Sequence, residues 1–167
     1  MSDVMKKFLS KLLVIVAMIT CGCGSSRNTE IVSRYDLRVA MEAADDSLPS
    51  MLNASSAEEN AEENFKHISD LDYSKVDSYF VSYSEEGLAD EIAVIAVKDP
   101  QDVKEAKESL EDHRDDRYKL LEQYEPEEVK RIEDGIVFST GSYAVLIICD
   151  DPGAVRAAFE DAVSGEE

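Results

Sequence analysis

The chain has 167 residues, about the length of one domain. Apolar types make up 44% of it, enough for a hydrophobic core, and its formal net charge is −20. Nucleic acids and anionic lipid surfaces are bound through clustered lysine and arginine, so this charge argues against both kinds of partner. An acidic surface keeps a protein soluble, but it does not identify a specific ligand.

The N-terminal residues have the pattern of a secretory signal peptide. Lysines precede an apolar run over residues 12–19, and small residues follow it. The run is shorter than the about 20 residues that a membrane-spanning helix needs. A cleaved signal is therefore favoured, with an uncleaved anchor helix as the alternative.

Two cysteines directly follow the apolar run, in Thr20-Cys21-Gly22-Cys23-Gly24. This segment resembles the lipobox of bacterial lipoproteins, in which a small residue precedes a cysteine that receives a diacylglyceryl group. Gly22 makes Cys23 the favoured lipidation site, and Cys21 is the alternative. Because two acyl chains suffice for stable attachment, we expect a lipid anchor on the extracytoplasmic face of the bacterial cell membrane.

These features divide the chain into three parts. Residues 1–22 form the signal peptide, residues 23–35 the lipidated cysteine and a flexible tether, and residues 36–167 the folded domain. A flexible chain of the tether's length reaches roughly 20 Å. Cys149 is then the one cysteine of the folded part, so we expect no disulfide within it.

The folded part is expected to begin with helices. Asp36 is placed to cap a helix whose apolar residues recur at helical spacing over residues 37–48. Ser56 and Glu59 have capping-box spacing, which favours a second helix. A disordered acidic loop over residues 53–64 is the alternative.

Four strands are predicted next. They cover residues 76–84, 92–97, 136–140 and 143–149, which are rich in strand-forming types. The second and fourth are apolar on both faces, as interior strands are. Gly141 opens the two-residue turn between the last two strands and fits a type II′ turn.

Each pair of strands is followed by a helix that opens with Asp-Pro. Asp99 and Asp151 are the expected N-caps, and Val103 and Val155 recur at the same offset from them. The repeat indicates two β-β-α units, although chance use of a common helix opener is the alternative. We therefore predict an α+β fold: a two-layer sandwich of one four-stranded antiparallel sheet with helices on one face, preceded by N-terminal helices.

A single helical layer would leave the other face of the sheet open or lined by a partner. Tyr79 and Tyr83, or their neighbours on the same strand, are therefore the first place to look for a binding surface.

Few side chains suggest chemistry. His113 and Asp116 are three residues apart on one helix and could touch one metal ion, but a salt-bridged helix surface is favoured and no metal site or cofactor is predicted. Cys149 is followed by acids rather than cations, which favours a buried hydrophobe over a catalytic thiol. Arg117 falls in the apolar stripe of its helix, where a charge must pair, reach solvent or bind an anion. Pairing with a carboxylate is favoured there, and a small anion pocket is the alternative.

From about Asp36 to Val163 the chain resembles the DUF4358 lipoprotein family of clostridia-like Firmicutes. The resemblance is carried by three segments, Ala89-Asp90-Glu91-Ile92-Ala93-Val94-Ile95, Tyr124-Glu125-Pro126-Glu127-Glu128-Val129 and Gly141-Ser142-Tyr143. The family has no known function, so the resemblance implies a location and a fold but no catalytic residues.

The sequence contains no phosphate-binding loop, serine-nucleophile elbow or zinc motif. We therefore expect a non-enzymatic binding or accessory module with a protein partner in the cell envelope and no nucleic acid. A subunit of an envelope transport or redox system is the alternative, and a small hydrolase is least favoured.

Overall fold

The computed structural model describes residues 33–164. The expected signal peptide, both candidate lipidation cysteines and most of the expected tether lie outside the described residues. The described part is an α+β domain with one antiparallel sheet, as the sequence predicts. The helices are α2 (Arg34–Glu42), α3 (Ala61–Phe65), α4 (Val103–Tyr124), α5 (Val129–Asp134) and α6 (Pro152–Val163).

The sheet has five strands, where the sequence predicted four. The strands are β1 (Met51–Ser55), β2 (Val76–Ser84), β3 (Glu91–Val97), β4 (Ile136–Thr140) and β5 (Tyr143–Ile148). Their order across the sheet is β1-β2-β3-β5-β4. The two strands that are apolar on both faces, β3 and β5, are interior strands, as expected.

The additional strand, β1, ends inside residues 53–64, where a helix or a loop was expected. Glu58, rather than Glu59, reaches back over the turn, where it accepts a hydrogen bond from the backbone N–H of Ser55 at 3.0 Å. Only the short helix α3 follows. The expected helix is thus present but shortened, and the strand was missed because β1 gains its stability from pairing with β2, which local helix signals do not report.

The first helix also begins earlier than expected. Its N-cap is Ser33, not Asp36, and the Ser33 hydroxyl accepts a hydrogen bond from the Asp36 backbone N–H at 3.2 Å. No helix in residues 33–164 combines the length and apolar character that a membrane crossing requires.

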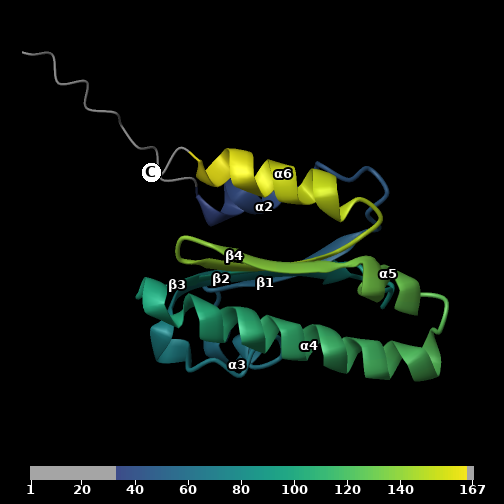
Figure 1. The fold of residues 1–167 in the computed structure, drawn as a ribbon, viewed down its shortest axis with the longest axis horizontal. Coiled ribbons are helices and arrows are strands. Elements are labelled where there is room, and N and C mark those ends of the chain that lie inside the picture. The colour runs from purple at the N-terminus through teal and green to yellow at the C-terminus, as the bar shows by residue number, and fades with distance from the viewer. Residues whose placement is uncertain (1–32, 165–167) are drawn as a thin grey trace, which may run out of the picture.

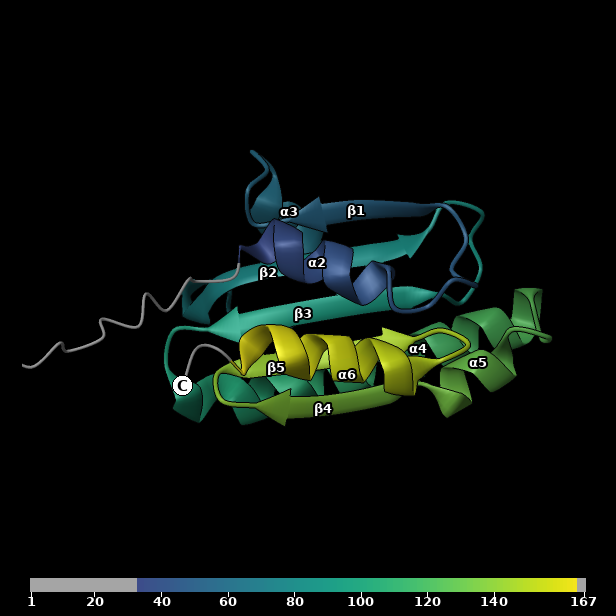
Figure 2. The same cartoon turned by 90° about the horizontal axis from the view of Figure 1, so that it is seen from above.

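Helices cover both faces of the sheet, which makes three layers rather than the predicted two. In Figure 1, α2 and α6 lie above the sheet, and α3 and α4 lie below it, with α5 at one end. Figure 2 shows the same sheet from above, with α2 and α6 nearest the viewer. We call these surfaces the α6 face and the α4 face.

The repeat therefore does not place its two helices on the same face, and the expected one-sided layer was wrong. Val97 and Cys149 each stand two residues before the Asp that opens a helix. Val97 belongs to the core of the α4 face, and Cys149 to that of the α6 face. Because side chains alternate along a strand, this difference directs the following helices to opposite sides.

The local signals of the repeat were nevertheless read correctly. The Asp99 side chain accepts a hydrogen bond from the Gln101 N–H at 3.0 Å and caps a 3-10 turn, Pro100–Asp102, that leads into α4. Asp151 caps α6 itself and accepts a hydrogen bond from the Ala154 N–H at 2.9 Å. Gly141 has a φ of 53°, and no non-glycine residue of the described part, Ser142 included, has a positive φ, which fits the predicted type II′ turn.

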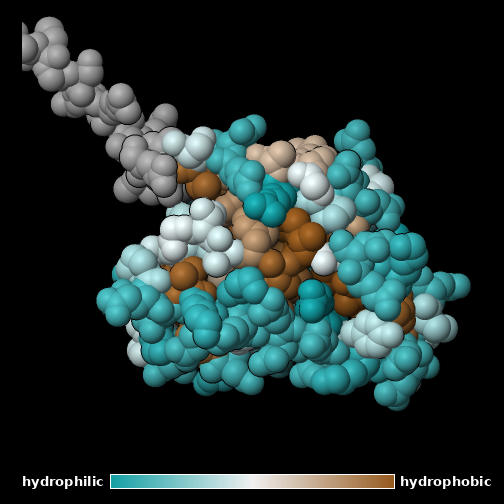
Figure 3. Space-filling model, in the orientation of Figure 1, coloured by the Kyte–Doolittle hydropathy of each residue, from teal (hydrophilic) through white to brown (hydrophobic). Residues whose placement is uncertain are grey.

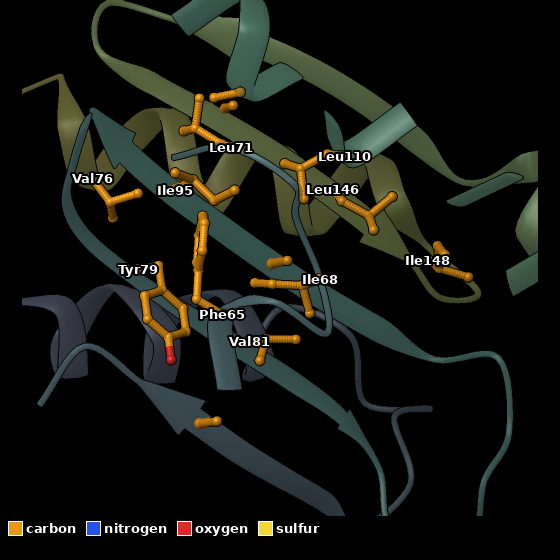
Figure 4. Packing of buried hydrophobic residues seen from close by; sticks show 14 of the residues in the cluster. Phe65, Ile68, Leu71, Val76, Tyr79, Val81, Ile95, Leu110, Leu146 and Ile148 are labelled. Atoms are coloured by element: carbon orange, nitrogen blue, oxygen red, sulfur yellow. The ribbon is translucent and has the colours of Figure 1, made fainter. Parts of the chain in front are cut away.

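Each face has its own apolar core. Figure 4 shows the core of the α4 face, where side chains from α3, α4 and the strands interlock around Phe65, Tyr79 and Ile95. The core of the α6 face packs Val155 and Phe159 against the opposite side of the sheet. In Figure 3, apolar surface runs between the hydrophilic outer sides of the two helical layers.

Candidate functional site

One end of the α4 face is incompletely covered. Leu52 of β1 pairs with Tyr83 of β2, which pairs with Glu91 of β3, so the three side chains form one row across the sheet. The next row, with Ala54 and Val81, is buried in the core of the α4 face. Leu52 is 43% and Tyr83 38% exposed, because the five-residue helix α3 does not extend over them.

A buried carboxylate lies beside these exposed side chains. Glu91 is 2% exposed although it begins an otherwise apolar strand. Its Oε1 lies 2.7 Å from Nε2 of His113, and its Oε2 lies 3.2 Å from a guanidinium nitrogen of Arg117. His113 and Arg117 are four residues apart on α4 and therefore project from the same side of the helix. A buried charge is costly unless it is paired, and here one carboxylate has two partners.

The same arginine also holds the backbone that leads into β3. Its second terminal nitrogen donates to the carbonyls of Leu88 at 3.2 Å and Ala89 at 3.1 Å. The Ala89 N–H donates to Glu128 at 3.0 Å. The segment before β3 is thus fixed from two helices, α4 and the start of α5, which gives Glu91 a set position.

A neighbouring ion cluster fixes Asp90. Arg131 of α5 contacts Asp90 at 3.2 Å, Glu128 at 2.6 Å and Asp150 at 3.0 Å. Burial raises the pKa of Asp90, and the charge of Arg131 opposes part of that increase. The cluster ties the start of β3 to the end of β5 and serves as a support for the site.

A pocket of about 390 Å³ opens where the exposed row meets α3 and α4. Its lining combines apolar, amide and charged side chains: Asn53, Ala54, Glu58, Asn64, His67, Ile68, Val81, Tyr83, Glu91, His113 and Arg117. Both histidines of the chain, His67 and His113, line this pocket. Its volume is within the range of ligand pockets, about 300–1,000 Å³.

Arg117 also keeps one donor unused. Its Nε is buried and has no hydrogen-bond partner among the described residues. Unpaired buried donors are rare and cost about 1–3 kcal/mol each. The site therefore retains an unsatisfied polar group at its centre.

A larger pocket of about 560 Å³ lies between the β4–β5 turn and the end of α6. Its charged lining residues, Asp77 and Glu160, are exposed, and its wall includes Ser164, where the described part ends. It has no buried charge comparable to Glu91. The pocket on the α4 face is therefore the stronger candidate site.

The structure brings two of the sequence candidates together and separates the others. Arg117 and His113 meet at Glu91, so His113 is not part of the expected salt-bridged helix surface. Asp116 instead pairs with Lys119 at 2.7 Å. No group of three or more residues in the described part could hold a metal ion.

The two tyrosines of the expected binding surface have different environments. Tyr79 is 1% exposed, and its hydroxyl donates to the Ala61 carbonyl at 2.6 Å, so it belongs to the core. Burial raises its pKa to about 12. Tyr83 lines the pocket. The sheet has no wholly open face, but Tyr83 lies where the covering helices end.

Cys149 is a free, buried thiol. It is 1% exposed, and burial together with the adjacent Asp45 carboxylate raises its pKa to about 12. A thiol with that pKa is a poor nucleophile, which agrees with the expected buried hydrophobe.

Sequence reasoning did not identify Glu91 as the partner of Arg117. The signal available in the sequence was a carboxylate at the start of a strand that is otherwise wholly apolar. The register of that strand turns the carboxylate toward the helix carrying Arg117. That register depends on β2 and β5, whose pairing with β3 cannot be read from local patterns.

A sequence model of a domain of unknown function, DUF4358, matches residues 50–149. The matched segment contains the whole pocket lining and all five strands of the sheet. The helices α2 and α6 lie outside it. No curated protein and no solved structure matches the chain.

Proposed function

The chain belongs to the DUF4358 family, and from that premise we propose that it is a lipid-anchored binding module of the cell envelope. It is anchored outside the membrane through acylated Cys23, and it holds a protein partner at the pocket on the α4 face. The family description names no activity, so the proposal depends on the site's geometry.

The observation that carries this proposal is the exposed Tyr83 and Leu52 beside the buried Glu91–Arg117 pair. Aromatic side chains and arginine are enriched where proteins bind tightly, around a core that excludes water. Glu91, His113 and Arg117 are held before any ligand arrives, which lowers the entropic cost of binding.

The arrangement favours binding over catalysis. Each carboxylate oxygen of Glu91 contacts a partner, His113 or Arg117, which favours a structural role for this carboxylate over a role as a general base. The pocket lining contains no serine, threonine or cysteine that could act as a nucleophile. A redox role through Cys149 is disfavoured by its burial and raised pKa.

The position of the pocket suits an anchor at the N-terminal end. The helices nearest the two described ends, α2 and α6, pack together on the α6 face, whereas the pocket is on the α4 face (Figure 1). A membrane attachment that precedes α2 therefore leaves the pocket accessible to other envelope proteins.

The anchor is tested by labelling cells with a palmitate analogue. The proposal expects that the Cys23→Ala chain carries no label, while Cys21→Ala is labelled like the unaltered chain. Label that persists in Cys23→Ala and disappears in Cys21→Ala would move the anchor to Cys21, and label on neither chain would contradict lipidation.

The binding surface is tested by crosslinking in intact membranes and affinity capture of the full chain. Tyr83→Ser is compared with Tyr124→Ser, the same substitution at a tyrosine that is 72% exposed and lies outside the pocket. We expect Tyr83→Ser to lose a crosslinked partner that Tyr124→Ser retains. Identical crosslink patterns for the two variants would argue against this surface.

A further inference from the structure

The edge of the sheet next to the pocket has hydrogen-bonding groups without partners. β1 is an edge strand, and in Figure 2 no described strand lies beyond it. Unpaired strand edges are ready templates for another extended chain, and proteins commonly block them.

The pairing with β2 identifies the backbone groups that face outward. Glu85 N–H donates to the Ser50 carbonyl, and Ser56 N–H donates to the Tyr79 carbonyl. Because inward and outward groups alternate along an antiparallel strand, the N–H and C=O groups of residues 51, 53 and 55 point away from β2.

One of these three outward positions is already blocked. The Ser55 N–H donates to the Glu58 side chain, and the Ser55 carbonyl accepts from the Glu58 N–H at 3.2 Å. Met51 and Asn53 have no such partner among residues 33–164. The free edge is therefore short and centred on Asn53.

The two sides of this edge differ in character. An added strand that pairs antiparallel with β1 directs alternate side chains to the α4 face, beside Leu52 and the pocket, where apolar groups fit. The remaining side chains point to the α6 face, toward a hollow lined by Arg34 and Arg38. Cationic side chains are disfavoured on that side.

Acidic side chains lie beyond both ends of β1. Glu85 and Glu86 form the turn next to its start, and Glu58, Glu59, Glu62 and Glu63 follow its end. Among these six residues, a described ion pair exists only for Glu62, which contacts Lys66 at 3.1 Å. A segment with basic residues at its two ends complements this distribution.

We propose that β1 is extended by a strand from a partner protein, which pairs antiparallel with Met51 and Asn53. The partner segment has apolar side chains at alternate positions over the pocket, neutral side chains between them and basic residues at both ends. Antiparallel pairing continues the pattern of the sheet and is the more stable arrangement per residue. This inference rests on the proposed function and specifies the partner.

The test uses synthetic peptides and the full chain in detergent, with binding followed by fluorescence anisotropy. The first peptide alternates valine and threonine and has lysines at both ends. The second replaces these lysines with glutamates. We expect the lysine peptide to bind on the order of tenfold more tightly, with an advantage that shrinks as salt is raised.

Backbone methylation tests strand addition directly. In the proposed register, threonine N–H groups face β1 and valine N–H groups face solvent. N-methylation of the threonines should weaken binding on the order of tenfold, as expected for lost main-chain hydrogen bonds, while N-methylation of the valines should change it little. Equal effects, or the reverse order, would overturn the proposed pairing.

A pair of variants applies the same test from the protein side. Asn53→Pro removes an outward N–H that no described group uses, and proline is tolerated at such edge positions. We expect Asn53→Pro to weaken binding of the lysine peptide more than Asn53→Ala does, because Asn53→Ala also shortens the side chain but keeps the backbone N–H. If Asn53→Pro does not fold, the methylated peptides still decide the matter.

The inference and the proposed function can fail separately. Failure of every peptide to bind, or concentration-dependent self-association of the chain through β1, would overturn strand addition by a partner. In either case a Tyr83-dependent crosslink in membranes would leave the proposed binding function intact.

Discussion

The two helices that open with Asp-Pro use their inner sides differently. α6 buries Val155 and Phe159, and Phe159 packs edge-on against Phe138 and Tyr143, with ring centres 5.6 and 5.7 Å away. α4 buries Ala106 and Leu110 near its start and Leu121 near its end, but its middle presents His113 and Arg117 to Glu91. The same start of a helix therefore leads to a sealed apolar contact in one case and to a charged site in the other.

This difference indicates where function is located. Apolar packing of the kind made by α6 stabilises a fold and requires no further explanation. A carboxylate buried under α4 carries a desolvation cost that an apolar residue would avoid. The middle of α4, with His113 and Arg117, is therefore the part of the molecule whose composition a structural role explains least.

The largest expected effect comes from breaking the charge pair under α4. Glu91→Leu leaves Arg117 without its carboxylate, and because Arg117 is partly exposed we expect a loss of about 2–3 kcal/mol in unfolding free energy. The double variant Glu91→Leu/Arg117→Met should recover only part of this loss, because it also removes the hydrogen bonds from Arg117 to the Leu88 and Ala89 carbonyls. Chemical denaturation measures the unfolding free energy of the unaltered full chain and of both variants.

A matched ion pair near the other helical layer is the control. Glu42 pairs with Arg38 at 2.7 Å, and its side chain is 22% exposed against 3% for Glu91. Because Glu42 also accepts a hydrogen bond from the buried Ser82 hydroxyl at 2.6 Å, we expect Glu42→Leu to cost about 1–2 kcal/mol. Equal costs for Glu42→Leu and Glu91→Leu would remove the contrast between the two sides of the sheet.

The equivalent valines of the two helices should differ in stability cost. Val155 is fully buried, whereas Val103 is only partly buried. We expect Val155→Ala to cost about 2–3 kcal/mol and Val103→Ala about 1 kcal/mol, measured by thermal and chemical unfolding. A larger cost at Val103 would mean that α4 packs more tightly along its start than the contacts indicate.

The two helix caps should behave alike. Asp99 and Asp151 each accept one backbone N–H at about the same distance. We expect Asp99→Ala and Asp151→Ala to lower the unfolding free energy by about 1 kcal/mol each. If the two stability costs differ by more than a factor of two, the two copies of the repeat are not equivalent even at their helix starts.

Two buried aspartates should change stability in opposite directions in acid. Burial opposes the charge of Asp45, but hydrogen bonds from Ser47 and from the Asp151 N–H lower its pKa from 3.8 to about 2. Its ionised form therefore stabilises the fold above pH 3.8, and this contribution is lost as pH falls toward 2.

The pKa of Asp90 is raised, mainly by burial, so the sign is reversed and its ionisation subtracts stability as pH rises above 3.8. Urea unfolding of Asp45→Asn and Asp90→Asn across this range should show opposite changes relative to the unaltered chain. Parallel changes would contradict the assigned environments.

Local signals predicted much of this fold. The strands over residues 76–84 and 136–140, the turn at Gly141 and both Asp-Pro helix starts were identified because each depends on neighbouring residues. β1 was missed because its pairing with β2 is non-local. The face on which each helix lies was missed because it depends on strand registers.

The candidate site was predicted only in part. The helical period placed Arg117 among apolar residues and so pointed to a buried partner. It could not identify Glu91 as that partner, since the two residues meet only after β3 pairs on both sides and α4 packs on the sheet. Tyr83 was named for a sheet face expected to be open, and it lines the pocket for a different reason, the shortness of α3.

The central claim is that a protein partner binds at the pocket on the α4 face. The most direct measurement introduces a photo-crosslinking amino acid at position 83 or at position 124 of the full chain in native membranes. Both native residues are exposed tyrosines, but only Tyr83 lines the pocket. The account predicts a covalent adduct with another protein from position 83 and none from position 124. Adducts of equal yield from both positions, or none from position 83, would contradict it.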